Sequence, residues 1–120
     1  MSDSSDRLYS IEQLKKFQGY SYEFLAHMLN IFVTHSGRTM DDFSEGLETG
    51  NVDLIKGSAH RIRPSVEFLE IVDIKEDIWQ LDKWPITFNS EMAGLADHVS
   101  KVLTIVIEQI KADLETERWR

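Results

Sequence analysis

Apolar side chains recur along this chain at three- and four-residue spacing rather than in alternation, a pattern typical of amphipathic helices. Only two prolines, Pro64 and Pro85, and six glycines interrupt it. The spacing predicts helices over about residues 11–18, 22–48, 52–69, 74–84 and 90–117. Two long helices and two further ones with short connections predict an all-α fold, an antiparallel four-helix bundle with a short additional N-terminal helix.

Local signals place the helix ends. Ser10 with Gln13 forms a capping-box pattern for the first helix, and Ser21 is the N-cap of the second. Gly50 followed by Asn51 predicts a stop and a new cap, and Gly37 is a candidate position for a kink. The chain is predicted to be one domain over residues 1–120, with residues 1–8 as a flexible leader.

The third helix has the most regular pattern. Its apolar positions follow one another at a three-four-three-four-three spacing: Val52, Ile55, Ala59, Ile62, Val66 and Leu69. On a helical wheel of about 100° per residue, His60 lies about 130° from the centre of this stripe and should face solvent. An exposed imidazole with a pKa near 6.5 is mostly neutral at pH 7, so one ring nitrogen has a lone pair for nucleophilic attack.

The neighbours of His60 suit phosphoryl transfer. Lys56 and Arg63 lie one turn away on the same face, where a cation stabilises the charge on a transferred phosphoryl group. Gly57 and Pro64 are unfavourable in a helix interior and would leave the backbone accessible to a partner. Glu67, one turn further, is a candidate for orienting the imidazole ring through its other nitrogen.

The composition of the chain excludes several classes of partner and site. The chain has 13 Lys and Arg against 21 Asp and Glu, a net charge of −8, which argues against nucleic acid or an anionic membrane as partner. It has no cysteine, which excludes disulfides, thiolate metal sites and thiol nucleophiles. The apolar runs are far shorter than the roughly 20 residues of a membrane span, and the N-terminus does not resemble a secretory signal, so a cytoplasmic location is expected.

The segment Ala-His-Arg-Ile-Arg-Pro-Ser over residues 59–65, followed by Phe68 and Leu69, resembles the His-x-Leu-Lys-Gly-Ser signature of histidine-containing phosphotransfer (HPt) domains. The preceding stretch, residues 29–51, also resembles that family's second helix and the turn after it. The resemblance implies a helical bundle that carries a phosphoryl group between receiver-domain aspartates and has no ATP-binding kinase domain, so it is not an enzyme in its own right.

By position, the resemblance makes His60 the phosphoacceptor and Arg63 the counterpart of the family's lysine. Pro64 replaces a glycine, and Glu70 stands where the family commonly has a second glycine. The implied partners are response-regulator receiver domains and a sensor (hybrid) histidine kinase, with Mg²⁺ only in the receiver and the chain itself a monomer without a cofactor.

Partner binding is expected at Gly57, Arg61 and Pro64 around the histidine, together with Phe68. Receiver domains present an apolar patch around an acidic pocket, which a mixed basic and apolar face would complement. On the wheel Phe68 lies about 150° from the stripe centre. It is therefore either exposed for docking or packed beneath the first helix, and the sequence leaves both alternatives open.

Three other interpretations compete. A docking or sequestering module of the same fold would bind receivers with His60 unphosphorylated. The string around His60 also resembles the dimerisation helix of sensor histidine kinases, but Arg61 replaces its acidic residue and 120 residues cannot hold a kinase domain as well. His27, His35 and His98 are candidate metal ligands, although their spacing matches no metal motif, and no metal is expected.

Overall fold

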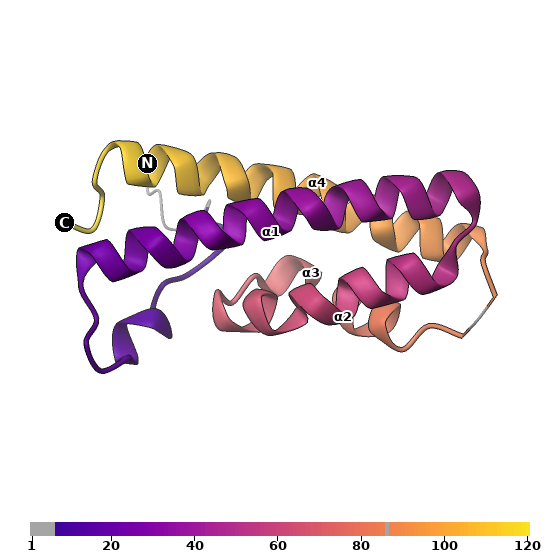
Figure 1. Cartoon of the computed structure of the whole chain (residues 1–120), viewed down its shortest axis with the longest axis horizontal. Coiled ribbons are helices and arrows are strands. Elements are labelled where there is room, and N and C mark those ends of the chain that lie inside the picture. The colour runs from indigo at the N-terminus through magenta and orange to yellow at the C-terminus, as the bar shows by residue number, and fades with distance from the viewer. Residues whose placement is uncertain (1–6, 86) are drawn as a thin grey trace.

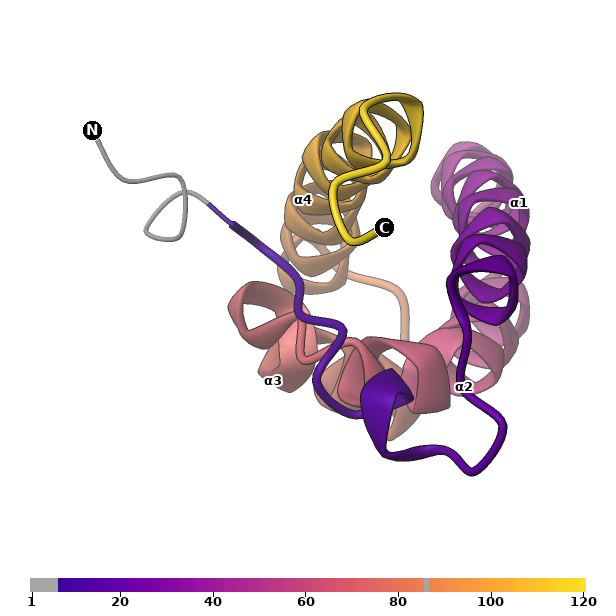
Figure 2. The ribbon, with the colours of Figure 1, turned by 90° about the vertical axis from the view of Figure 1, so that its left-hand side faces the viewer.

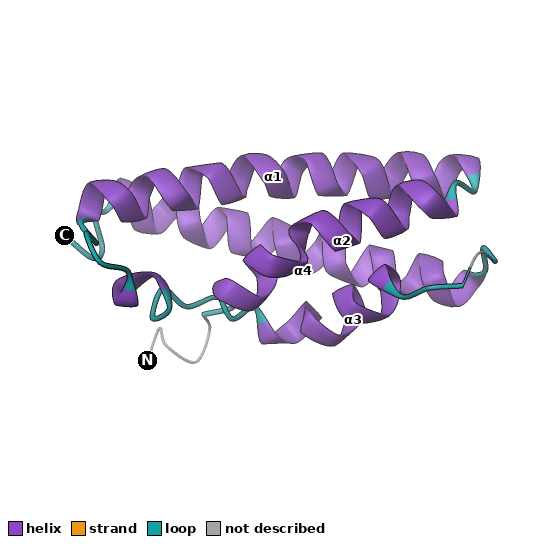
Figure 3. Cartoon of the chain, turned by 60° about the horizontal axis from the view of Figure 1, so that its bottom comes forward, coloured by secondary structure: helices purple, strands orange, loops and turns teal. Residues whose placement is uncertain are grey.

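The computed structural model describes residues 7–85 and 87–120, and Figure 1 shows that these are helical with no strand. It contains four α-helices: α1 (Tyr22–Thr49), α2 (Val52–Phe68), α3 (Val72–Asp82) and α4 (Ser90–Glu115). Figure 3 shows the short loops that join them. The prediction of an all-α chain with four helices is confirmed.

The predicted caps account for the helix boundaries. The Ser21 hydroxyl accepts a hydrogen bond from the Phe24 amide at 3.0 Å, and the Asn51 side chain accepts one from Leu54 at 3.1 Å. Gly50 ends α1 in the left-handed conformation, with a φ of 70°, which costs glycine little because it has no Cβ. α1 continues through Gly37 without interruption.

The prediction of a helix over residues 11–18 is wrong, because only a single 3-10 turn, Leu14–Lys16, forms there. The Ser10 amide donates to the Leu69 carbonyl at 2.8 Å, and the Gln13 amide group donates to Glu70 at 3.2 Å. These contacts to the end of α2 replace the capping box. Of the predicted leader, residues 1–6 lie outside the described residues, and the Leu8 amide donates to Gln109 of α4 at 3.0 Å.

The conformation of the turn after α2 explains why a glycine would suit position 70, where the resemblance implies one. Glu70 has a φ of 52°, in the left-handed region that disfavours most side chains. The Ile71 amide donates to the Val66 carbonyl at 3.0 Å, which is the long bond of a Schellman motif with Glu70 at its left-handed position. A glycine would adopt this conformation without strain.

The core lies inside a ring of helix contacts. α1 packs against α2 and α4, and α3 packs against α2 and α4 in turn, as the end-on view of Figure 2 shows. In Figure 1 the two long helices, α1 and α4, run in opposite directions. Every predicted stripe residue of the third helix is buried: Val52, Ile55, Ala59, Ile62, Val66 and Leu69. Because this stripe faces the core, the opposite face of α2 is left open to solvent.

Candidate functional site

His60 lies on the solvent-facing side of α2, as the wheel predicts, and 73% of its side chain is exposed. The neighbouring residues Ala59 and Ile62 point into the core and fix the rotation of the helix. The imidazole is therefore accessible to another macromolecule, while its backbone belongs to a packed element.

A carboxylate from α3 holds one edge of the ring. The Nδ1 atom of His60 lies 3.2 Å from Oδ1 and 3.3 Å from Oδ2 of Asp82, the last residue of α3. The Asp82 side chain is only 7% exposed. Arg63, one turn after His60 on α2, donates through Nη1 to Asp82 Oδ2 at 3.0 Å. One buried carboxylate thus links the histidine and the arginine.

The charges in this cluster are mutually stabilised. Burial raises the pKa of Asp82, but the hydrogen bonds from Arg63 and His60 outweigh it and hold the pKa below the ordinary value of 3.8. The hydrogen bonds to Asp82 and Glu67 raise the pKa of Arg63 in turn. At neutral pH the site therefore contains a carboxylate and a guanidinium, both charged.

This partner fixes the tautomer of the neutral imidazole. A carboxylate only accepts hydrogen bonds, so the proton of the neutral ring is on Nδ1, facing Asp82. The Nε2 atom has no hydrogen-bond partner among residues 7–85 and 87–120. Its lone pair is therefore available to an electrophile from solvent.

Asp82 is the functional residue that sequence reasoning missed. Glu67, the candidate for orienting the ring, accepts instead from Arg63 Nε at 3.1 Å. Asp82 is 22 residues from His60, and only the packing of α3 against α2 brings the two together. The available signal was a polar residue directly after the buried Leu81, at the edge of the apolar stripe of α3.

The other predicted residues surround His60 on the same helix. Lys56 lies one turn before it and forms no ion pair within the described part of the chain. Pro64 is exposed. A Cβ on Gly57 would meet only Arg61 Nη1, at 3.5 Å, so packing does not require a glycine there. Arg61 turns towards α1, where its Nη2 atom lies 3.2 Å from Asp42 Oδ2.

Phe68 is partly buried, near the end of α2. Its ring centroid lies 5.1 Å from that of Phe17, with an angle of 40° between the rings. Of the two alternatives, the structure favours packing beneath the N-terminal segment. Phe17 itself is 45% exposed, so an aromatic surface remains beside Phe68, which lies about two turns after His60 on α2.

The remaining histidines do not converge. His98 Nδ1 lies 2.5 Å from Asp77 Oδ2, in a second histidine–aspartate pair that joins α4 to α3. His27 and His35 are exposed on α1. In the described ranges, no group of three or more His, Asp or Glu side chains is arranged to hold a metal ion. None of the helices described is long and apolar enough to cross a membrane.

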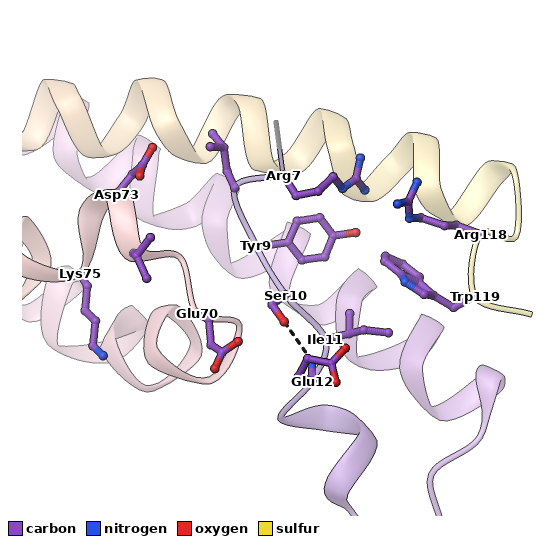
Figure 4. A pocket seen from close by; sticks show the side chains of 12 residues that line it. Arg7, Tyr9, Ser10, Ile11, Glu12, Glu70, Asp73, Lys75, Arg118 and Trp119 are labelled. Carbon is purple, nitrogen blue, oxygen red and sulfur yellow. Dashed lines mark hydrogen bonds between the residues drawn. The ribbon is translucent and has the colours of Figure 1, made fainter. Parts of the chain in front are cut away.

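A cavity of about 650 Å³ lies where the N-terminal segment meets the α2–α3 turn and the end of α4 (Figure 4). Its basic residues, Arg7, Lys75 and Arg118, are balanced by the acidic Glu12, Glu70 and Asp73. The Tyr9 hydroxyl donates to Asp113 at 2.6 Å, and burial raises the pKa of Tyr9 well above its usual value. His60 does not line this cavity.

Comparisons with protein-family models, with curated proteins and with solved structures give no match for this chain. The chemistry of the site therefore has to follow from its own residues.

Proposed function

We propose that this chain is a histidine-containing phosphotransfer protein of a two-component phosphorelay, built as an antiparallel four-helix bundle. His60 accepts a phosphoryl group from the aspartyl phosphate of one receiver domain and passes it to another. One observation carries the proposal: an imidazole that is 73% exposed has its Nδ1 atom against the buried Asp82 carboxylate and its Nε2 atom open to solvent.

The transfer is a substitution at phosphorus. The Nε2 lone pair attacks the phosphorus atom, the bond to the receiver's aspartyl oxygen breaks, and its electron pair leaves with that carboxylate. The ring becomes positively charged while the proton stays on Nδ1, and the negative charge of Asp82, 3.2 Å away, stabilises it. The reverse step passes the group to the next receiver.

Two cations support the phosphorylated state. Arg63 holds Asp82 through Nη1 and Glu67 through Nε, which leaves its Nη2 atom for a phosphoryl oxygen. Lys56 lies one turn to the other side of His60 and has no competing ion pair among the described residues. Both charges act on the three equatorial oxygens, where negative charge is spread during transfer.

The partners are receiver domains and the sensor (hybrid) histidine kinase that supplies them. A receiver binds at the face of α2 that carries Gly57, His60 and Pro64, where no side chain other than Arg61 approaches Gly57. The kinase supplies ATP chemistry and the receiver supplies Mg²⁺. The chain acts as a monomeric carrier in the cytoplasm.

The direct test mixes the protein with a panel of phosphorylated receiver domains. We expect an acid-labile, alkali-stable phosphate to appear on the wild type and not on the His60→Gln variant. Peptide mapping should place the label on His60. Binding of the same receivers is measured in parallel by calorimetry. If wild type and variant bind a receiver equally and neither is labelled, the protein is a docking module and not a phosphoryl carrier.

A further inference from the structure

A second cavity lies between α1 and α2, on the side of α2 away from α3. It has a volume of about 280 Å³ and is lined by His35, Arg38, Thr39, Ser58, Arg61 and Ile62. The cavity is separate from the cluster of His60, Arg63 and Asp82. Its lining residue Arg61 contacts Asp42 of α1, whereas Arg63 contacts Asp82 of α3. The proposed relay gives this cavity no role.

Two hydroxyl groups, from residues that are otherwise buried, line the cavity without hydrogen-bond partners among the described residues. Thr39 is 4% exposed and Ser58 is 2% exposed. Neither side chain forms a hydrogen bond within the part of the chain that the structure describes. Their oxygen atoms are not sealed in the core, as that of Ser36 is, but open onto the cavity. Both hydroxyls are therefore available to donate a hydrogen bond to an oxygen atom of a molecule bound in the cavity.

The rim of the cavity is basic. His35 and Arg38 are exposed on α1, and no acidic partner is found for either among the described residues. Arg61 uses one nitrogen for Asp42 and retains further N–H donors. None of the six lining residues is acidic. In a chain of net charge −8, this local excess of donors and cations selects an anion.

The size of the cavity and its apolar surroundings indicate which class of anion would fit. A water molecule occupies roughly 30 Å³ of liquid, so the cavity holds more than an inorganic oxyanion. Ile62 supplies an apolar wall. A neighbouring apolar cavity of about 190 Å³, lined by Phe32 and Phe68 among others, shares His35 as a wall. An apolar group could extend along this side of α1.

We propose that the cavity between α1 and α2 binds a small organic oxyanion, a phosphate monoester or a carboxylate with an apolar group. The oxyanion accepts hydrogen bonds from Thr39 and Ser58 and pairs with Arg38 and Arg61. Its apolar part lies against Ile62 and His35. The site is separate from His60, so the ligand binds whether or not the histidine acts as a phosphoacceptor.

The test is an NMR titration of the wild-type protein with inorganic phosphate, phenyl phosphate, benzoate and neutral benzamide. We expect saturable shifts of the Thr39, Ser58 and Arg61 amides with phenyl phosphate or benzoate, weaker binding of inorganic phosphate, and none of benzamide. Whichever of the two aromatic anions binds tighter identifies the headgroup. If neither shifts these amides, or if benzamide binds as well as benzoate, the proposal is wrong.

Variants separate a ligand site from a surface of diffuse positive charge. Thr39→Val and Ser58→Ala remove hydroxyls that have no partner in the described structure, so both variants should fold with undiminished melting temperatures. Each should weaken binding roughly tenfold, and Arg38→Gln at least as much. Thr104→Val, an exposed hydroxyl on α4, and His60→Gln should leave affinity unchanged. Equal affinity in all five variants would contradict the proposal.

Discussion

At the scale of single residues, Asp82 is the carboxylate that faces the His60 ring, with its Oδ1 atom 3.2 Å from Nδ1. Its carboxylate fixes the proton on Nδ1, and in the proposed transfer it faces the positive charge that develops on the ring when Nε2 attacks phosphorus. Replacing Asp82 with Ala removes a hydrogen bond to a charged group, which is worth about 1.5 to 3 kcal/mol. We therefore expect phosphoryl transfer to His60 to slow by roughly tenfold to a hundredfold, measured as the rate of labelling by a phosphorylated receiver.

Asp77→Ala is the matched control for this experiment. It breaks the equivalent pair with His98 on the same helix, α3, but on the side that faces α4. If the two histidine–aspartate pairs serve only to pack α3 against its neighbours, Asp82→Ala and Asp77→Ala should slow transfer equally. A selective loss in Asp82→Ala, with similar melting temperatures for the two proteins, would show that Asp82 positions the reacting ring.

Ser36 makes a residue-scale prediction about stability. It lies in α1 with none of its surface exposed, and its hydroxyl has no hydrogen-bond partner in the described structure. We expect Ser36→Ala to raise the free energy of unfolding by about 1 kcal/mol in chemical denaturation, because an unsatisfied hydroxyl leaves the core.

The control for Ser36→Ala is Ser44→Ala, an exposed position in the same helix. It reports the gain from helix propensity alone, which is about 0.5 kcal/mol. A stabilisation no larger at Ser36 than at Ser44 would mean that the buried hydroxyl finds a partner in solution.

At the scale of elements, local chemistry explains which helices could be predicted. The caps at Ser21 and Asn51 bond to amides three residues later, so a short stretch of sequence contains the whole signal. The capping pattern at Ser10 fails because the Ser10 amide bonds to Leu69, which only the folded chain brings near. Asp82 was missed for the same reason, since its contact with His60 crosses from one helix to another.

The α1–α2 hairpin depends on one glycine. A Cβ on Gly46 would lie 2.4 Å from Cγ1 of Ile55, which is buried at the start of α2. We expect Gly46→Ala to lower the free energy of unfolding by about 1 to 3 kcal/mol, because the helices must separate or Ile55 must leave its rotamer. Chemical denaturation monitored by circular dichroism would measure it.

Gly37→Ala is the matched substitution within α1. Nothing lies within 4 Å of a Cβ built at Gly37, so alanine should stabilise the helix by up to about 1 kcal/mol. Opposite signs at the two positions are the expected outcome. A stabilising Gly46→Ala would show that α1 and α2 do not approach as closely as the structure indicates.

At the scale of the whole molecule, α3 closes the ring of helices through charged pairs as well as apolar packing. Asp82 joins it to His60 and Arg63 of α2, and Asp77 joins it to His98 of α4. α3 is also the shortest of the four helices. Its fixed position is what keeps the carboxylate against the imidazole, so the stability of the fold and the chemistry of the site share the same contacts.

This coupling predicts how stability depends on pH. Hydrogen bonds from Arg63 and His60 lower the pKa of Asp82 in the folded state, so folding favours its ionised form. The stabilisation is fully present above the unfolded pKa of about 3.9 and is lost as the pH falls through the lower folded pKa. The free energy of unfolding of the wild type should exceed that of Asp82→Asn at pH 7, and the difference should shrink below about pH 4.

Comparing the wild type with Asp82→Asn separates the effect of the Asp82 ion pair from that of the other charges of the chain. Acidification also takes the chain from a net charge of −8 through zero to a positive charge, but this change is almost the same in wild type and variant. Denaturant unfolding of both proteins between pH 2 and pH 7, at about 0.15 M salt, measures the difference directly. A difference that stays constant down to pH 2 would mean that Asp82 stabilises the fold by packing rather than by charge.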